Sequence, residues 1–297
     1  LFEAAVLSNN DLDNTTLVLA HVTQMATGDF SNVYGSGSAL SIQSGYGLGF
    51  TLAGSGNFTN MGTVALGNED AIGDYVDNTT DGVTVGAVIY KGIEGLTLQA
   101  WDYYAWDLMN SIYLQADYGW NCLLNENVKM KASAQYINQS DAGDSLAGDV
   151  KGNYWAAKLG ASSGALSGYV AYSQTLDDDS TLGHGIITPW GGMPAFTQGM
   201  VTRHQFFNDT DTWKVAGTYK MNELLGANVK ATAYYTSFDV GNSTYAANTT
   251  SDEWGWDVQY QATENLNLRV RANYPREFTG NDGFGWDEYR VIANYNF

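Results

Sequence analysis

The chain has 297 residues, 44% of them apolar, which suits one large domain or two small ones. Its 13 basic and 32 acidic side chains give a formal net charge of −19, and the basic residues are too few and dispersed for a nucleic-acid surface. With 20 Tyr and 9 Trp but only 3 Pro, the composition favours many strands. No stretch reaches the roughly 18 apolar residues of a membrane-spanning helix, so only a closed β-barrel would carry this chain across a bilayer.

The N-terminus and the single cysteine limit what can be said of targeting and of cysteine chemistry. The chain begins without Met, a basic n-region or an apolar h-region, so we expect any secretion signal to have been removed or to lie outside it. Cys122 is the only cysteine, which excludes a disulfide, a redox pair and a multi-cysteine zinc site within the chain.

Alternation of apolar and polar side chains with a period of two residues predicts an all-β protein. At 110–120, for example, Ile112 and Leu114 alternate with Tyr113 and Gln115. We expect thirteen strands, at 3–8, 15–25, 82–90, 95–105, 110–120, 127–137, 152–161, 165–174, 212–221, 228–238, 253–261, 266–274 and 286–297.

The connections between these strands alternate between short and long. A soluble sandwich also alternates along its strands but has no reason to sort its loops in this way, whereas outer-membrane barrels join short periplasmic turns to long outer loops. The short set is 9–14, 91–94, 121–126, 162–164, 222–227 and 262–265. The long set is 26–81, 138–151, 175–211, 239–252 and 275–285, with 106–109 as its one short member.

The number of predicted strands indicates whether the barrel is complete within this sequence. If the short turns are periplasmic, the first and last predicted strands both run inward. A barrel with both ends in the periplasm has an even number of strands. We therefore expect residues 1–297 to be a single β-barrel domain that lacks an odd number of N-terminal strands.

Three segments resemble the OprD-like outer-membrane porins, in particular the branch with the major outer-membrane porins of epsilonproteobacteria. They are GLTLQAWDYY at 95–104, ITPWG at 187–191 and DTWK at 211–214, and the terminal strand ending at Phe297 also fits. The resemblance implies eighteen strands in the complete barrel, with five before Leu1. It also implies that 175–211 is the seventh outer loop, one of two that narrow the pore; its candidate constriction residues are Asp177, Asp178, Asp179, Pro189 and Trp190.

Charged residues on the polar faces of the strands are the candidate pore lining. Inward charges set the potential of a wide channel, whereas lipid-facing charges would be costly. A basic wall facing acidic loops would orient dipolar solutes; alternatively, these are ordinary solvated lumen residues. The candidates are Lys129, Lys131, Lys158, Lys214, Lys220, Lys230, Arg269, Arg271, Arg290, Asp117, Asp257 and Glu288, with Asp102 as a further acid directed at the lumen.

Cofactor and enzyme chemistry find little support. The acidic run at 177–179 lacks the spacing of an EF-hand loop, so it is read either as a solvated loop or as part of a calcium site gathered from several loops. No other cofactor is expected. Only His21, His184 and His204 are present, and none lies in a Ser–His pattern, so we expect no enzymatic activity.

The sequence thus predicts an outer-membrane porin for passive diffusion of small hydrophilic solutes and ions, in contact with outer-membrane lipids and lipopolysaccharide. Porins commonly form trimers, so a homotrimer is a further expectation. The alternative is a structural or adhesive surface protein with a blocked lumen, which the polar inward faces disfavour.

Overall fold

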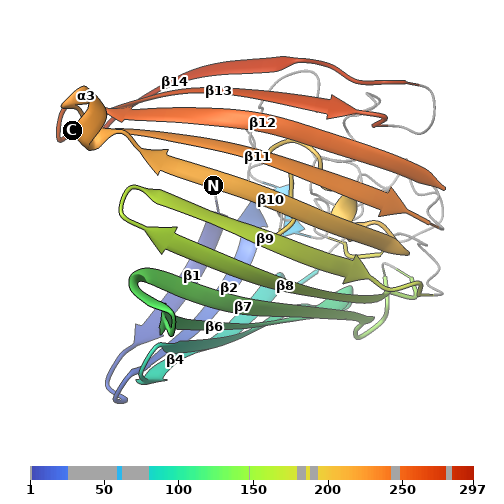
Figure 1. Ribbon diagram of the computed structural model, residues 1–297. Helices are drawn as coiled ribbons and strands as arrows, with labels where there is room; N and C mark the ends of the chain where they lie inside the picture. Colours follow the sequence, from blue (N-terminus) through green and yellow to red (C-terminus); the bar gives the residue numbers. More distant parts are fainter. Residues whose placement is uncertain are drawn as a thin grey trace.

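The computed structural model describes residues 2–25, 59–61, 80–146, 148–178, 185–187, 193–241, 248–278 and 283–297. The chain forms one curved antiparallel sheet (Figure 1). Its strands are β1 (Phe2–Asn9), β2 (Thr15–Met25), β3 (Thr59–Asn60), β4 (Val83–Ile93), β5 (Leu96–Ala105), β6 (Met109–Cys122), β7 (Asn125–Asp141), β8 (Lys151–Ser163), β9 (Leu166–Thr175), β10 (Thr210–Lys220), β11 (Val229–Val240), β12 (Thr249–Gln261), β13 (Leu266–Arg276) and β14 (Glu288–Tyr295).

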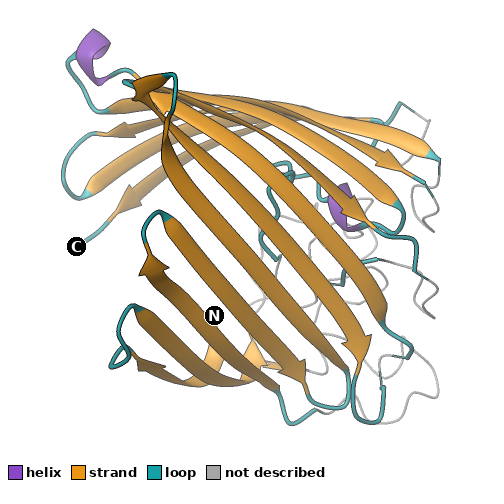
Figure 2. Cartoon of the chain, turned by 60° about the horizontal axis from the view of Figure 1, so that its bottom comes forward, coloured by secondary structure: helices purple, strands orange, loops and turns teal. Residues whose placement is uncertain are grey.

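The thirteen predicted strands are confirmed, and each pairs with its neighbour in the chain, from β1 through β2, β4 and so on to β14. Figure 1 shows the short turns at one end of the sheet and the longer connections at the other. Figure 2 shows the strands wrapping around a concave side. The alternation of connections was therefore a correct guide to strand direction.

Local features differ from the sequence-based expectation. The two-residue β3, inside the predicted loop 26–81, pairs Asn60 with Gln24 on β2. The turn expected at 222–227 contains one helical turn, α3 (Asn222–Leu225), which ends at Gly226 in the left-handed conformation (φ 60°). β7 extends to Asp141, beyond the predicted end at residue 137, because pairing continues with β6 and β8 on both sides.

The convex face of the sheet is apolar and exposed. Leu114 is 41% exposed, Val170 56% and Val291 83%, the reverse of a water-soluble protein and the arrangement of a lipid-facing surface. No described helix is long and apolar enough to cross a membrane. Tyr and Trp mark two levels of this face: Tyr136, Trp155, Tyr172, Trp213, Tyr235, Trp254, Tyr274 and Tyr289 toward the long connections, and Tyr90, Tyr118, Trp120, Tyr219, Tyr260 and Tyr295 toward the short turns.

Asp102 corrects one expectation. It is exposed on the convex face rather than directed at the concave side. Its neighbours Trp101 and Tyr103 point the other way and pack against buried residues of the concave side. Because the concave face of β4 and β5 is itself apolar near the long connections, an apolar residue there did not identify the lipid-facing side.

The buried core lies on the concave face, beneath the connection between β9 and β10. Ile137, Tyr154 and Phe206 belong to one cluster of this core, in which the ring centroids of Tyr154 and Phe206 are 5.2 Å apart. Phe206 belongs to the short 3-10 helix η3 (His204–Phe206), which Figure 2 shows inside the curve of the sheet. The connection thus folds back against the strands.

Candidate pore lining and constriction loop

A first group of predicted lining residues lies on the concave face of β6 and β7. The Nζ of Lys131 is 3.0 Å from Oδ1 of Asp117. Ser133 and Gln115 also donate hydrogen bonds to this carboxylate, each at 2.6 Å. Asp117 is therefore held on both oxygens, while 56% of the Lys131 side chain remains exposed.

A hollow of about 880 Å³ opens on the concave face beside this group. It reaches from β6 across β7, β8 and β9 to β10. Its wall combines basic, aromatic and hydroxyl side chains, which include Lys129, Lys131, Lys158, Tyr169 and Thr218.

A second charged group lies on β12, β13 and β14. Arg269 donates to Asp257 through Nε at 2.7 Å and also through Nη2, while Arg290 pairs with Glu288 at 2.5 Å. Arg271 lies opposite Asp257 and Arg290 in the register. Its buried Nε has no hydrogen-bond partner among the described residues. Three guanidinium groups and two carboxylates leave this wall with an excess positive charge.

Lys220 and Lys230 face each other directly in the register of β10 and β11, at the end with the short turns. One step further along the concave face, the hydroxyls of Thr218 and Thr232 are 2.8 Å apart. Like charges at directly opposite positions repel each other unless water screens them, so this pair fits a solvated rim.

The residues 193–209, here called the constriction segment, lie across the concave face. Phe196 N–H donates to Gln135 Oε1 at 3.2 Å, and Thr236 Oγ1 donates to the carbonyl oxygen of Thr197 at 2.8 Å. On the far side of the segment, Thr175 Oγ1 donates to a backbone carbonyl, that of Gln205, at 2.6 Å. Polar side chains from several strands therefore hold the segment by its backbone.

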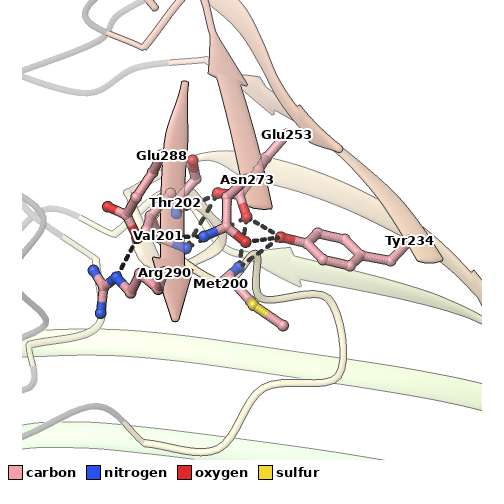
Figure 3. A network of polar contacts seen from close by, with 8 residues as sticks. All are labelled: Met200, Val201, Thr202, Tyr234, Glu253, Asn273, Glu288 and Arg290. Atoms are coloured by element: carbon pink, nitrogen blue, oxygen red, sulfur yellow. Dashed lines mark hydrogen bonds and ion pairs between the residues drawn. The ribbon is translucent and has the colours of Figure 1, made fainter. Parts of the chain in front are cut away.

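A buried carboxylate makes the densest of these contacts (Figure 3). Glu253 on β12 is fully buried and accepts backbone hydrogen bonds from Met200 at 2.6 Å, Val201 at 3.2 Å and Thr202 at 2.7 Å. The hydroxyl of Tyr234 on β11 donates to the same carboxylate. Four donors thus converge on one anion, which supplies the strong, charge-assisted type of hydrogen bond.

The network continues from Glu253 to the second charged group. Tyr234 lies 3.2 Å from Asn273 Oδ1, and Asn273 Nδ2 lies 3.3 Å from Glu288, the partner of Arg290 (Figure 3). The constriction segment and the arginine-rich wall therefore share one set of polar contacts.

Two predicted lining lysines are covered by the constriction segment. Lys158 Nζ lies 4.1 Å from the ring centroid of Phe196. Lys214 donates to the carbonyl oxygen of Gln198 and lies 4.5 Å from the ring centroid of Tyr234. Both residues are on the concave face as predicted, but they contact the segment rather than standing free.

The predicted constriction residues are only partly covered by the structure. Asp177 accepts from Asn208 Nδ2 at 2.6 Å, and the backbone N–H of Asp178 donates to Asn208 Oδ1 at 3.0 Å. Asp179, Pro189 and Trp190 lie outside the described residues. Within the described residues no three His, Cys, Asp or Glu side chains form a group that could hold a metal. A calcium site therefore stays a prediction.

Sequence reasoning missed the residues that hold the loop. Gln139 receives Ile187 N–H and donates to the Ile187 carbonyl oxygen, both at 2.7 Å, yet neither Gln139 nor Glu253 was a candidate. The alternation in 253–261 already places Glu253 on the same face as Asp257, and this was the available signal. Its backbone partners, more than 50 positions earlier, had no sequence signal.

The comparisons agree with this geometry. A family model described as outer membrane porin, OprD family, matches residues 1–297. No curated protein matches the chain. Among solved structures, Pseudomonas aeruginosa OccK5 (OpdH) superposes with a TM-score of 0.69 at 15% identity, and the match covers 99% of this chain and 70% of the OccK5 chain.

P. aeruginosa OccK9 (OpdG) superposes with a TM-score of 0.70 at 16% identity, and the match covers 99% of this chain and 66% of OccK9. P. aeruginosa OpdK with vanillate superposes with a TM-score of 0.70 at 14% identity, and the match covers 99% of this chain and 68% of OpdK. The chain thus spans about two thirds of the length of these neighbours. They support an all-β barrel fold, while the epsilonproteobacterial branch stays a prediction.

Proposed function

Because this chain belongs to the OprD family of outer-membrane porins, we propose that it forms a water-filled channel through which small hydrophilic solutes and ions diffuse passively. The observation that carries the proposal is the sorting of side chains between the two faces of the sheet. The convex face is apolar and exposed, whereas the concave face bears charged groups and a hollow of about 880 Å³. Charged groups that line a barrel interior without an ion-pair or hydrogen-bond partner require water around them.

The charge of the wall supports a preference among solutes. Six basic residues among the predicted lining form no ion pair with any described residue: Lys129, Lys158, Lys214, Lys220, Lys230 and Arg271. We propose that this basic wall, opposite the acidic outer loops, attracts anions and orients dipolar solutes as they pass. One neighbour was solved with vanillate, so vanillate is a suitable organic anion for a first test.

The channel is tested in planar bilayers and by liposome swelling. We expect discrete conductance steps from the full-length protein, including any strands outside residues 1–297, and swelling in isotonic solutions of small solutes. A protein that inserts yet shows neither would instead be a structural or adhesive surface protein with a blocked lumen.

The wall charge gives a second prediction. Replacing Lys129, an exposed residue of the hollow, with Glu should lower the chloride-to-potassium permeability ratio by roughly twofold, because a cation on the solute path becomes an anion. The reversal potential in a KCl gradient measures this ratio. Lys151→Glu is the matched control: Lys151 lies on the opposite face of its strand and pairs with Asp149, so its reversal should leave the potential unchanged. Equal shifts in both variants would contradict the proposed wall.

Barrel completion and oligomeric state are parts of the same proposal. The chain lies in the outer membrane, and we propose that residues 1–297 form one barrel domain completed by further strands. Contact with lipopolysaccharide and a homotrimer complete the proposal. Native mass spectrometry of the detergent-extracted protein distinguishes a trimer from a monomer.

A further inference from the structure

We propose that Glu253 is a positioning residue of the pore, and that its carboxylate latches residues 198–202 to the barrel wall and so sets the width of the constriction. This inference rests on the proposed channel function. The latch consists of the Glu253 carboxylate, the Tyr234 hydroxyl and the three backbone N–H groups of residues 200–202 (Figure 3).

The latch requires both side-chain oxygens of Glu253 to accept hydrogen bonds. Oε1 receives Met200 N–H and the Tyr234 hydroxyl, and Oε2 receives Val201 and Thr202 N–H. A glutamine at position 253 would present one carbonyl oxygen and one NH₂ group, and its NH₂ group would meet backbone donors. The site therefore needs two acceptor oxygens and not merely a side chain of that shape.

The segment is shaped to fit this carboxylate. A Cβ on Gly199 would lie 2.7 Å from Glu253 Oε2 and 2.9 Å from the carbonyl oxygen of Thr202, closer than real Cβ contacts. Only glycine lets the backbone approach the carboxylate this closely without a shift of the segment.

A cation on the same wall holds the start of this stretch. Lys214 on β10 donates to the carbonyl oxygen of Gln198, while Glu253 receives the N–H groups that follow. The carbonyl oxygen of Gln198 therefore faces a positive side chain, and the N–H groups of 200–202 face a negative one. Each peptide dipole is oriented favourably toward the charge that it meets. The two charges also interact with each other and reduce the cost of burial.

Position explains why the latch acts on the pore. The carboxylate comes from the wall of the barrel, and the groups it holds belong to the segment that lies across the concave face. Loss of the latch leaves the strand pairing of β12 with β11 and β13 in place, because that pairing uses backbone groups. The segment would then move away from the wall without unfolding the barrel.

Glu253→Gln tests the latch by single-channel recording. Hydrogen bonds to a charged group are worth enough that weakening them should raise the time spent at altered conductance levels by about tenfold to a hundredfold. Glu264→Gln is the matched control, because it removes the same charge from the exposed turn after the same strand. Wild-type-like traces from Glu253→Gln in a channel that otherwise conducts would overturn the latch, whereas silent wild-type protein would overturn the channel itself.

Gly199→Ala approaches the same contact from the loop side. It should reproduce the Glu253→Gln phenotype, and the double variant should add little to either single change, because both remove one interaction. Fully additive effects would contradict a shared latch. Exclusively reduced folding yield, with normal traces from the folded fraction, would show that Glu253 serves barrel stability alone.

Cysteine labelling gives a readout that a purely structural role would not move. In a Cys122→Ser background, Val201→Cys places a thiol at a position that is 6% exposed. A thiol reagent added to folded barrels should react about tenfold faster when Glu253→Gln is also present. Equal labelling rates with and without Glu253→Gln would overturn the proposal.

Discussion

Replacing Val215 with Arg is expected to destabilise the folded barrel by about 2–4 kcal/mol, the cost of an arginine at the middle of the lipid-facing band. Val215 lies on the convex face of β10, is 43% exposed and stands between the two aromatic levels marked by Trp213 and Tyr219. Its partners across the sheet are Val170 and Tyr235, which offer no charge to the guanidinium group. Denaturant-induced unfolding in lipid vesicles measures the change.

The control for this prediction lies on the same strand. Thr218 points to the concave face and borders the hollow, so Thr218→Arg places the same side chain in water and should change stability much less. Equal losses in the two variants would mean that the convex face of β10 does not meet lipid.

The contrast between Val215 and Thr218 also shows what the sequence alone predicts well. Because a strand's side chains alternate strictly, Trp213, Val215 and Tyr219 identify one face without any knowledge of the fold. The same argument placed Lys129 and Arg271 on the concave face. Backbone periodicity is local, and so it is readable from local sequence.

Asp102 shows where that reasoning fails. Near the long connections the concave face of β4 and β5 is apolar, because Val83 and Ala105 there belong to a buried core. An aromatic residue such as Tyr103 then carries no information about its face, and an adjacent acid is easily assigned to the wrong one. The error follows from the core on the concave face, which only the folded loop creates.

The candidate site was predictable only in part, for a related reason. Charged residues on strands were found from their own positions, but Glu253 acquires its role from backbone groups of residues 200–202. Backbone donors are the same for every residue type except proline, so the sequence does not mark them. The loop that supplies them is placed by tertiary contacts alone.

Acidification from pH 7 to pH 5 is expected to weaken the packing of the constriction segment, because His204 at its centre is held neutral. The imidazole is completely buried, with ring centroids of Phe207 at 4.6 Å and Phe278 at 4.9 Å, and its Nδ1 lies 2.5 Å from Ser251 Oγ. Burial lowers the pKa of His204 from its usual 6.5 to about 3. Among the described residues no charged group stabilises the protonated ring, so the neutral form is the one that packs.

The sign follows from this depressed pKa. Above about pH 6.5 the ring is neutral in both the packed and the released segment, and its contribution is fully present; as the pH falls from 6.5 toward 3, only the released segment takes up the proton. Each pH unit in this window removes roughly 1.4 kcal/mol from the packing free energy. Limited proteolysis of the folded barrel at pH 7, 6 and 5 measures this loss. His204→Phe keeps an aromatic ring among its neighbours but does not titrate, so cleavage of this variant should not accelerate over the same range; unchanged acid sensitivity would place the responsible group elsewhere.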